Sequence, residues 1–297
     1  MAALRDQLRM SANALRTPRV PEPPLVSVVI ATYNYSSVLR HAVASALGQR
    51  YPNIEVLVVG DACTDDSEEV VASIGDPRVR WHNLESNWGT QSGPNNAGIE
   101  MARGELIAYH GHDDIWTANH LAHAVAALRR GADLAHTVTL TLGPPGTNIR
   151  DLHGLQPHPD APGWIAPSSV VHTRALVDVI GPWRHWRDVA HMTDRDFTTR
   201  AAAAGTVARV PALTVFKLNA TLRPNCYVDK PDHEQAELLR RVRTQRRLVH
   251  RELVATAWAK RFRTTSQPAD FPELDPRPEP ETSDWKWRMS QRIRGLE

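Results

Sequence analysis

Residues 25–34 read LVSVVIATYN, a β-branched run that ends in a threonine, a tyrosine and an asparagine. The run is too apolar to alternate between core and solvent, which is the pattern of a central parallel strand covered on both faces. A segment with helical spacing, SSVLRHAVASALGQ, follows at once. The sequence therefore predicts a strand and helix unit that begins near Leu25, with three polar residues at the strand end.

The same pattern recurs further along the chain. Residues 53–75, NIEVLVVGDACTDDSEEVVASIG, give a second buried strand, a polar turn and a helix whose expected cap is Asp65 or Asp66. VRWHNLE predicts a short third strand, and ELIAYHGHDD, residues 105–114, a fourth before a helix over 117–131. Successive units of this kind predict an α/β fold with a mixed, mainly parallel sheet flanked by helices, whose ligands gather at the carboxyl ends of the strands.

Composition excludes some classes of partner. Lys plus Arg total 35 and Asp plus Glu total 33, a net charge of +2, so no global field attracts nucleic acid and we expect no such partner. Cys63 and Cys226 are too few for a disulfide framework, which fits a reducing compartment. No segment approaches membrane-spanning length. We therefore expect a cytoplasmic protein, at most peripheral to the inner face of the membrane.

Four segments are expected along the chain. Residues 1–24 predict an N-terminal helix and a Pro-rich linker, 25–131 and 132–230 the two halves of one domain, and 231–297 a C-terminal helical extension and tail. The Arg-rich helical pattern over 232–262 is interpreted either as a solvated face or as a patch that meets anionic lipid or a partner. The appended helices at both ends also allow a homo-oligomer.

Polar clusters follow three of the predicted strands. A turn or helix cap alone explains the cluster of Thr32, Tyr33 and Asn34. Capping also explains Asp65 or Asp66, but it does not explain Asp61. A carboxylate held at a strand end can accept an imide N–H such as that of uracil or thymine, whereas cytosine has none. The three clusters are Thr32, Tyr33 and Asn34; Asp61, Asp65 and Asp66; and His112, Asp113 and Asp114.

Adjacent Asp113 and Asp114 repel each other unless a cation lies between them. Carboxylate oxygens facing solvent suit Mg²⁺ or Mn²⁺ bridged to a diphosphate, while an acid-rich helix start is an equal alternative, and both can hold together. A third interpretation is that His110, His112 and Asp114 resemble the start of the His-x-His-x-Asp-His zinc motif of metallo-hydrolases. The next residue is Ile115 rather than histidine, so that motif is incomplete.

Together, VSVVIATYN, VLVVGDACTDDS, NWGTQSGPNNAGIEMARGELIAYHGHDD and the following IW resemble the nucleotide-sugar-binding half of inverting family 2 glycosyltransferases of GT-A fold. The resemblance implies that the half 25–131 binds the nucleotide sugar and the half 132–230 the acceptor. It also implies that Asp114, with help from Asp113, holds Mn²⁺ or Mg²⁺. The residues expected to bind the donor are Thr32, Tyr33, Asn34, Asp61, Asn96, His112 and Asp113.

The chain departs from the family pattern at two places. Gly111 stands where the first aspartate of Leu-Asp-x-Asp-Asp is common, so metal ligation is expected to depend on Asp114. Asn95 stands where an arginine is usual, which removes a cation that could hold the diphosphate. Lys217 and Arg223 are candidates to supply that charge instead, a hypothesis from charge need alone.

A second match covers SSVVHTRALVDVIGPWRHWRD and HMTDRDFTTRAAAAG, which resemble the acceptor region of the family. The resemblance places Asp194 on the acid that serves as base, Asp196 on a downstream aspartate and Arg200 on a helix arginine, with Thr193 where a glutamate is common. Inversion by direct displacement needs such a base, because the acceptor hydroxyl loses its proton as it attacks. A helix cap is the alternative role for Asp194.

The expected function is an inverting, metal-dependent glycosyltransferase of the hexosyltransferase-like EC 2.4 class. It would move a sugar from a UDP- or dTDP-sugar to the hydroxyl of a glycan, a lipid-linked acceptor or a small molecule. Thr193 and Asn95 motivate one alternative, a non-catalytic nucleotide-sugar-binding protein of the same fold. His110 and His112 motivate the other, a zinc-dependent metallo-hydrolase.

Overall fold

The computed structural model describes most of the chain. The predicted N-terminal helix and nearly all of the predicted linker lie outside the described residues, as does most of the predicted C-terminal tail. The described residues are 22–147, 149–154, 164–190, 192–245, 247, 251, 254–255, 258–259 and 284–296.

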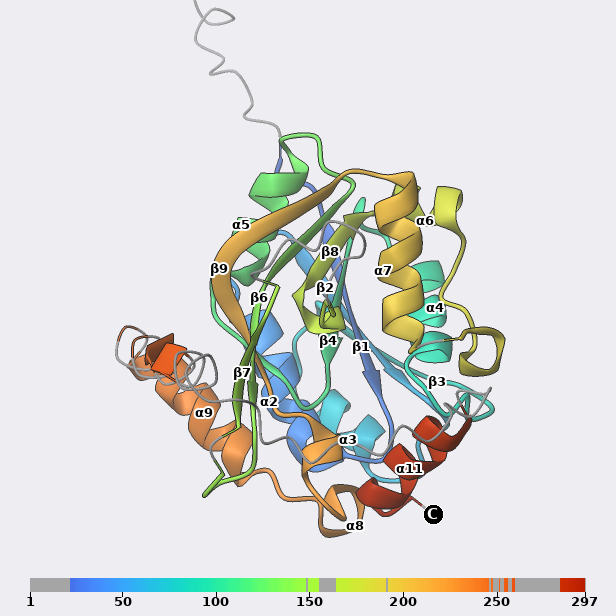
Figure 1. The fold of residues 1–297 in the computed structure, drawn as a ribbon, viewed down its shortest axis with the longest axis vertical. Coiled ribbons are helices and arrows are strands. Elements are labelled where there is room, and N and C mark those ends of the chain that lie inside the picture. Colours follow the sequence, from blue (N-terminus) through green and yellow to red (C-terminus); the bar gives the residue numbers. More distant parts are fainter. Residues whose placement is uncertain are drawn as a thin grey trace, which may run out of the picture.

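The strands of the described residues form one nine-stranded sheet in the order β3-β2-β1-β4-β8-β6-β9-β5, with β7 paired to β6 (Figure 1). Their bounds are β1 Val26–Thr32, β2 Ile54–Gly60, β3 Val79–Asn83, β4 Leu106–Gly111, β5 Ile115–Trp116, β6 Leu134–Leu142, β7 Arg150–His153, β8 Val170–Thr173 and β9 Val207–Lys217.

Strand direction decides which residues meet. β1, β2, β3 and β4 are parallel, β8 is antiparallel to β4, and β6 is antiparallel to β8 and parallel to β9. β1, β2, β4, β6 and β9 therefore all run the same way, and their carboxyl ends lie at one edge of the sheet, the lower edge in Figure 1. This confirms the predicted α/β fold with a mixed, mainly parallel sheet, and it gathers the strand-end residues at that edge.

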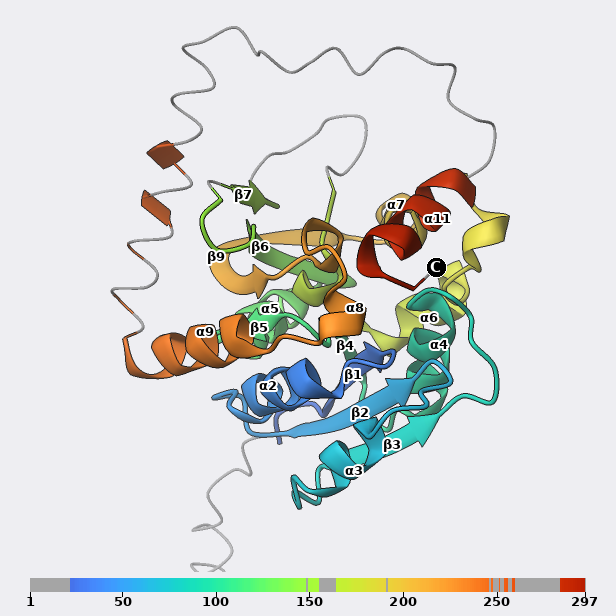
Figure 2. The same cartoon turned by 90° about the horizontal axis from the view of Figure 1, so that it is seen from below.

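Helices cover both faces of the sheet. α2, α5 and α9 lie on one side and α4, α6 and α7 on the other (Figure 2). The helix bounds are α2 Ser36–Leu47, α3 Ser67–Ala72, α4 Ser92–Met101, α5 His120–Leu128, α6 Arg174–Ile180, α7 Thr193–Ala204, α8 Cys226–Asp229, α9 His233–Thr244 and α11 Asp284–Arg294, with 3₁₀ turns η1 Pro167–Ser169, η2 Trp186–Asp188 and η3 Ala220–Leu222.

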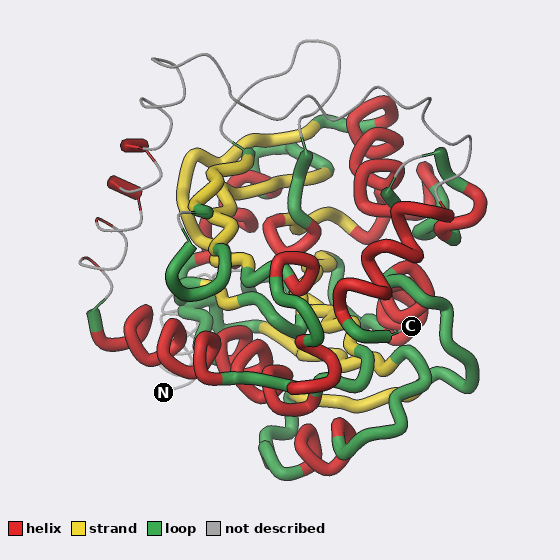
Figure 3. Tube along the Cα trace, turned by 60° about the horizontal axis from the view of Figure 1, so that its bottom comes forward, coloured by secondary structure: helices red, strands yellow, loops and turns green. Residues whose placement is uncertain are grey.

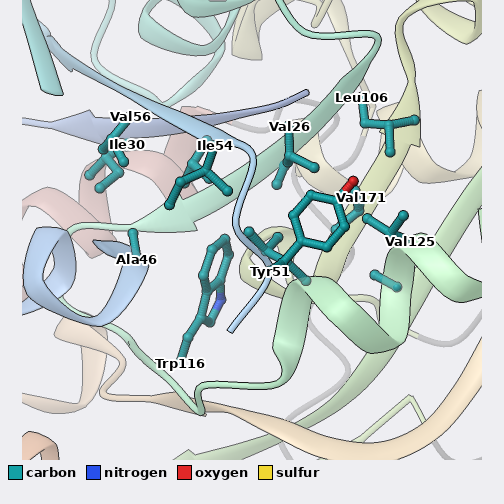
Figure 4. Close-up of a cluster of buried hydrophobic side chains, with 14 of the residues drawn as sticks. Val26, Ile30, Ala46, Tyr51, Ile54, Val56, Leu106, Trp116, Val125 and Val171 are labelled. Carbon is teal, nitrogen blue, oxygen red and sulfur yellow. The ribbon is translucent and has the colours of Figure 1, made fainter. Parts of the chain in front are cut away.

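The two faces of β1 belong to two different cores. Val28 and Ile30 pack with Leu39 of α2, whereas Val29 packs with Ile99 of α4. Figure 4 shows the first of these cores, with Ile30 of β1 beside Val56 of β2 and with Val26 of β1 and Trp116 in the same cluster. Each such side chain contributes about 1.5–3 kcal/mol on full burial. Because both faces are buried, the sequence of β1 shows no alternation.

The second half of the chain holds strands that the sequence did not predict. β7 forms within the Pro/Gly-rich crossing, and β6 is buried along its whole length although three of its nine residues, Thr137, Thr139 and Thr141, are threonines. The helix expected over 117–131 is shorter, because β5 comes first and the amide of Thr117 donates to the carbonyl of Thr214 at 2.9 Å. No helix among the described residues combines the length and hydrophobicity needed to cross a membrane.

Candidate active site

The predicted strand-end residues of β1, β2 and β4 lie next to one another. Thr32 pairs with Gly60 in the register of β1 and β2, and the amide of Asp61 donates to the carbonyl of Thr32 at 2.8 Å. Ala31 pairs with Gly111 on the other side, which brings His112 beside Thr32. The structure therefore brings together the three polar clusters that the sequence distributes over some 80 residues.

Asn34 joins the loops that follow β1 and β2. Its φ of 43° lies in the left-handed region, which asparagine tolerates better than most residues. Its Oδ1 accepts the amides of Thr64 at 2.7 Å and Asp65 at 3.2 Å. Asp65 in turn accepts the amides of Ser36 and Ser67, the first residues of α2 and α3. Of the two predicted cap residues, Asp66 is at the N-cap of α3, without a side-chain cap hydrogen bond. The expected contact between Asn34 and a nucleotide stays a prediction.

Asp61 is buried and fixes the loop after β3. Its Oδ1 accepts the amide of Trp88 at 2.8 Å, and its Oδ2 that of Gly89 at 3.0 Å. Burial raises the pKa of Asp61 to about 6, although these two amides act in the opposite direction. Each carboxylate oxygen has a second lone pair, so an imide N–H can still be accepted. The sequence did not predict that Asp61 organises this loop.

His112 links the end of β1 to α8. Its Nδ1 lies 2.8 Å from the Thr32 hydroxyl and its Nε2 lies 3.1 Å from the Tyr227 hydroxyl. Burial lowers the pKa of His112 to about 4, so the ring is neutral, with one nitrogen donating and the other accepting. Tyr227 also lies 6.4 Å, between ring centroids, from the half-buried Tyr33. No sequence motif surrounds Tyr227, so its position could not be predicted.

His110 is directed away from His112. Its ring stacks on Trp116 at 4.1 Å between centroids, and its Nε2 lies 2.9 Å from the Ser45 hydroxyl. Within the described ranges, no group of three or more His, Cys, Asp and Glu residues could hold a metal ion. The two histidines that motivated the zinc hypothesis therefore do not converge on a shared ligand position.

Asp113 and Asp114 lie in a tight turn between β4 and β5, not at a helix start. The amide of Asp114 donates to the carbonyl of Gly111 at 3.1 Å, and α5 begins only at His120. A Cβ on Gly111 would lie 2.7 Å from Oδ2 of Asp114 and 3.2 Å from Oδ1 of Asp113. A side chain at position 111 would therefore require the carboxylate of Asp114 to shift.

The carboxylate of Asp114 is fully buried and already has three hydrogen-bond donors. Oδ2 accepts the Ser168 hydroxyl at 2.5 Å and the Lys217 ammonium at 3.3 Å, and Oδ1 accepts the amide of Leu218 at 3.2 Å. Burial alone would lower the pKa of Lys217, but Asp114 and Asp113 outweigh it and raise that pKa above its ordinary value. Asp114 and Lys217 thus form a buried ion pair.

Whether a divalent cation fits this arrangement depends on how many carboxylate oxygens are open to it. Mg²⁺ and Mn²⁺ need several unencumbered oxygen ligands in a regular geometry. Both oxygens of Asp114 are engaged, and the Lys217 ammonium lies where a cation would approach. The residues as arranged do not fit a divalent ion at Asp114. Metal ligation by Asp113 and Asp114 stays a prediction, and it requires Lys217 to move.

Asp194 lies in the first turn of α7 and is 6% exposed. Its Oδ2 accepts the indole N–H of Trp164 at 2.9 Å, and its Oδ1 accepts the amide of Arg195 at 2.7 Å. Burial raises the pKa of this carboxyl. Met192, not Asp194, is the residue at the N-cap of α7. The role of Asp194 as a base remains a prediction, and Trp164 was not anticipated.

Three other residues singled out in the sequence, Asp196, Arg200 and Asn96, hold a turn. Asp196 pairs with Arg200 at 2.8 Å, and the Arg200 guanidinium donates to main-chain carbonyls of residues 180–182. Asn96 accepts the amide of Trp183 and donates to its carbonyl, at 2.9 and 2.8 Å. These side chains fix the segment between α6 and η2 against α4 and α7. The expected contact between Asn96 and the donor stays a prediction.

Of the two cations suggested for the diphosphate, Lys217 contacts the aspartate pair and Arg223 has other partners. Arg223 pairs with Glu234 at 2.6 Å and donates to the carbonyl of Leu142 at 3.2 Å, so it connects the end of β6 to α9. Lys217 contacts Asp114. Asn95, where an arginine is usual, is buried, and its side-chain NH₂ has no partner among the described residues.

α11 lies beside α8 at the same edge of the sheet (Figure 3). Gln291 donates to the carbonyl of Gly89 at 3.2 Å, and the Arg294 guanidinium lies 5.3 Å from the ring centroid of Tyr227. The predicted C-terminal extension therefore includes a helix that contacts both the loop held by Asp61 and the tyrosine held by His112.

Sequence comparison identifies relatives of the first half. The profile described as Glycosyl transferase family 2 matches residues 27–160. The chain is 35% identical over 107 residues to an uncharacterized glycosyltransferase of Rickettsia typhi, a match that covers 36% of this chain and 33% of that protein. It is 32% identical over 102 residues to the Escherichia coli UDP-Glc:alpha-D-GlcNAc-diphosphoundecaprenol beta-1,3-glucosyltransferase WfaP, covering 34% of this chain and 40% of WfaP. The matched segment thus spans only about a third to two fifths of these relatives.

Solved structures share the fold over a larger part of the chain. Staphylococcus aureus TarS in complex with UDP-GlcNAc superposes with a TM-score of 0.54 at 19% identity, covering 72% of this chain and 65% of TarS. The Pyrobaculum calidifontis mannosyltransferase PcManGT in complex with GDP-Man and Mn²⁺ gives 0.52 at 18% identity, covering 88% and 82%. Over residues 27–160 the chain is therefore similar to glycosyltransferase family 2, and its fold is similar to that of solved glycosyltransferases over a larger part of its length.

Proposed function

We propose that this chain is an inverting glycosyltransferase that moves a sugar from a UDP- or dTDP-sugar to an acceptor hydroxyl. One observation carries the proposal: two separate acidic sites share one electrostatic neighbourhood at the carboxyl edge. Asp113 and Asp114 come from the first half of the chain and Asp194 from the second. The charges of all three raise the pKa of Lys217. A donor site and an acceptor site with a buried acid are what direct displacement requires.

The base of the nucleotide is assigned to the strand ends beside Asp61. Uracil and thymine each have an N3–H that a buried carboxylate can accept, and cytosine lacks it. Tyr33 directly follows β1 at the same strand ends, and its ring is proposed to stack on the base. Two comparisons support a uracil donor: WfaP is named for UDP-Glc, and TarS was solved with UDP-GlcNAc.

Asp194 is the proposed general base. The acceptor oxygen attacks the anomeric carbon and its proton passes to the Asp194 carboxylate. The bond from that carbon to the diphosphate oxygen breaks, and its electron pair leaves with the diphosphate, so the configuration is inverted. Trp164 and the Arg195 amide hold the carboxylate in place, and burial raises its pKa, which makes it a stronger base. Asp196 is less suited, because its charge is already paired with Arg200.

The predicted Mn²⁺ or Mg²⁺ is retained here only as a hypothesis for Asp113, and none of the steps above depends on it. PcManGT, which shares the fold, was solved with Mn²⁺. The acceptor is proposed to be a hydroxyl of a glycan, a lipid-linked molecule or a small molecule; WfaP is named for a diphosphoundecaprenol-linked acceptor. Peripheral membrane contact and a homo-oligomer also stay predictions.

The experiment compares donor turnover with donor binding. Purified protein is incubated with UDP-glucose, UDP-GlcNAc or dTDP-glucose, and released nucleotide is measured with water as the default acceptor. Asp194→Asn should lose about 10²–10⁴-fold in turnover while its affinity for the nucleotide is kept. Asp178→Asn, an exposed change on α6, is the matched control and should behave as the wild type. Wild-type binding without turnover of any donor would instead favour the non-catalytic nucleotide-sugar-binding protein.

A further inference from the structure

Lys217 meets Asp114 because of strand register. β5 and β9 are antiparallel, with Ile115 opposite Phe216 and Trp116 opposite Val215. Continuing that register by one residue places Lys217 opposite Asp114. The amide of Leu218, the next residue, donates to Oδ1 of Asp114, which fixes the two chains on either side of the contact. The ion pair is therefore part of the sheet architecture and not a chance meeting of flexible side chains.

Ser168 fixes the same carboxylate from a third element, η1. Its hydroxyl oxygen accepts the amide of Gly111 at 2.9 Å and donates to Oδ2 of Asp114 at 2.5 Å. The hydroxyl is thus oriented by the turn that carries the aspartates. Asp114 is 0% exposed and has donors on both oxygens, so a metal ion could bind it only by displacing them.

Of this pair, only Lys217 has solvent-exposed surface. The Lys217 side chain is 18% exposed, whereas that of Asp114 is not exposed at all. An ammonium has three N–H donors, and one of them is used on Asp114. The other two remain for oxygens of a bound molecule, and a compact cation of this kind is a common ligand for phosphate.

The departing nucleoside diphosphate gains negative charge as the glycosidic bond breaks, and a positive group beside it stabilises that charge. We propose that the Lys217 ammonium, held by Asp114, occupies the place of the divalent cation and binds the diphosphate of the donor. This inference rests on the proposed function, and it makes Asp114 a positioning residue for Lys217 instead of a metal ligand. Donor binding should then need no added metal.

The test measures the affinity for UDP by calorimetry, in EDTA and in Mn²⁺, for the wild type, Lys217→Ala and Lys217→Arg. The wild type should bind UDP in both buffers with less than about a threefold difference. Lys217→Ala should bind about 10–100-fold more weakly in EDTA, the loss expected for one charged hydrogen bond. Mn²⁺ should restore part of its affinity, because the ammonium no longer lies where a cation would approach Asp114. Lys217→Arg keeps the charge and should stay independent of metal.

Lys230→Ala is the matched control. Lys230 also pairs with an aspartate, Asp65, whose side chain is 10% exposed, at 3.3 Å, the same distance as the Lys217 to Asp114 contact. It should lose an ion pair without gaining a response to Mn²⁺. If Lys217→Ala does not fold, as judged by circular dichroism, the wild type and Lys217→Arg decide the matter alone.

Two results would overturn the inference, and they can be told apart. UDP binding by the wild type that appears only with Mn²⁺ would show that a metal supplies the charge, and the proposed function would stand. No binding of UDP or of dTDP in either buffer would overturn the proposed function and the role of Lys217 with it.

Discussion

Replacing Asp61 by asparagine tests whether burial of the ionised carboxylate lowers the free energy of unfolding. Burial raises its pKa from 3.8 to about 6 in the folded protein. Between these two values the folded state binds more protons than the unfolded state, so the free energy of unfolding falls as the pH rises through this window. The contribution of Asp61 is fully present below pH 3.8 and has been lost by about pH 7.

The size of the effect follows from the pKa difference. One pKa unit corresponds to about 1.4 kcal/mol, so a rise from 3.8 to about 6 amounts to roughly 3 kcal/mol. Asparagine does not titrate, whereas all other groups titrate alike in both proteins. The free energy of unfolding of Asp61→Asn, relative to that of the wild type, should therefore increase by about 3 kcal/mol between about pH 4 and pH 7.

Urea unfolding followed by circular dichroism at several pH values measures this difference. Asp76→Asn is the control of opposite sign, because the Arg78 side chain and amide lower the pKa of Asp76 to about 2. That variant should lose stability relative to the wild type as the pH rises from about 2 to about 4, and the difference should stay nearly constant above that range. A flat difference for Asp61→Asn, or one that changes in the direction of the control, would refute the reasoning. It would mean that the Trp88 and Gly89 amides outweigh burial.

Three further changes test the packing around the site. Phe197→Ala removes a fully buried ring stacked on Trp183 at 4.4 Å and should cost about 3–5 kcal/mol in urea unfolding; a loss under about 1 kcal/mol would contradict the described core. Gly98→Ala would place a Cβ 2.3 Å from Cγ1 of Val29 and should lower the free energy of unfolding by about 1–3 kcal/mol. The same change on an exposed helix stabilises, so a rise in melting temperature would count against this packing. Tyr227→Phe leaves Nε2 of His112 without its partner and should cost about 1–3 kcal/mol; unchanged stability would show that the contact contributes little.

The part of the fold that was predictable from sequence is the part with two buried faces. β1 and β2 show unbroken apolar runs because each strand packs between helices on both sides. β6 was missed for the opposite reason: Thr137, Thr139 and Thr141 give it a polar alternation, yet all three are buried. A hydrophobic pattern cannot show that threonines face the interior of a sheet.

The candidate site was predictable where it depends on strand ends and not where it depends on long-range register. Thr32, Asp61 and His112 come together because parallel strands end at one edge. The contact between Lys217 and Asp114 joins residues 103 positions apart and depends on the pairing of a two-residue strand. A segment that short has no periodicity to detect, so the sequence suggested Lys217 only from charge need.

The proposed contact between Asp61 and the base is tested most directly by calorimetry of the wild type with UDP, dTDP and CDP in the same buffer. These nucleotides share the diphosphate, and UDP and CDP also share the ribose, so their difference isolates the N3–H that Asp61 is proposed to accept. The account predicts that UDP and dTDP bind and that CDP binds at least about tenfold more weakly, the value of one hydrogen bond to a charged group. Equal affinity for UDP and CDP, or no binding of any of the three, would contradict it.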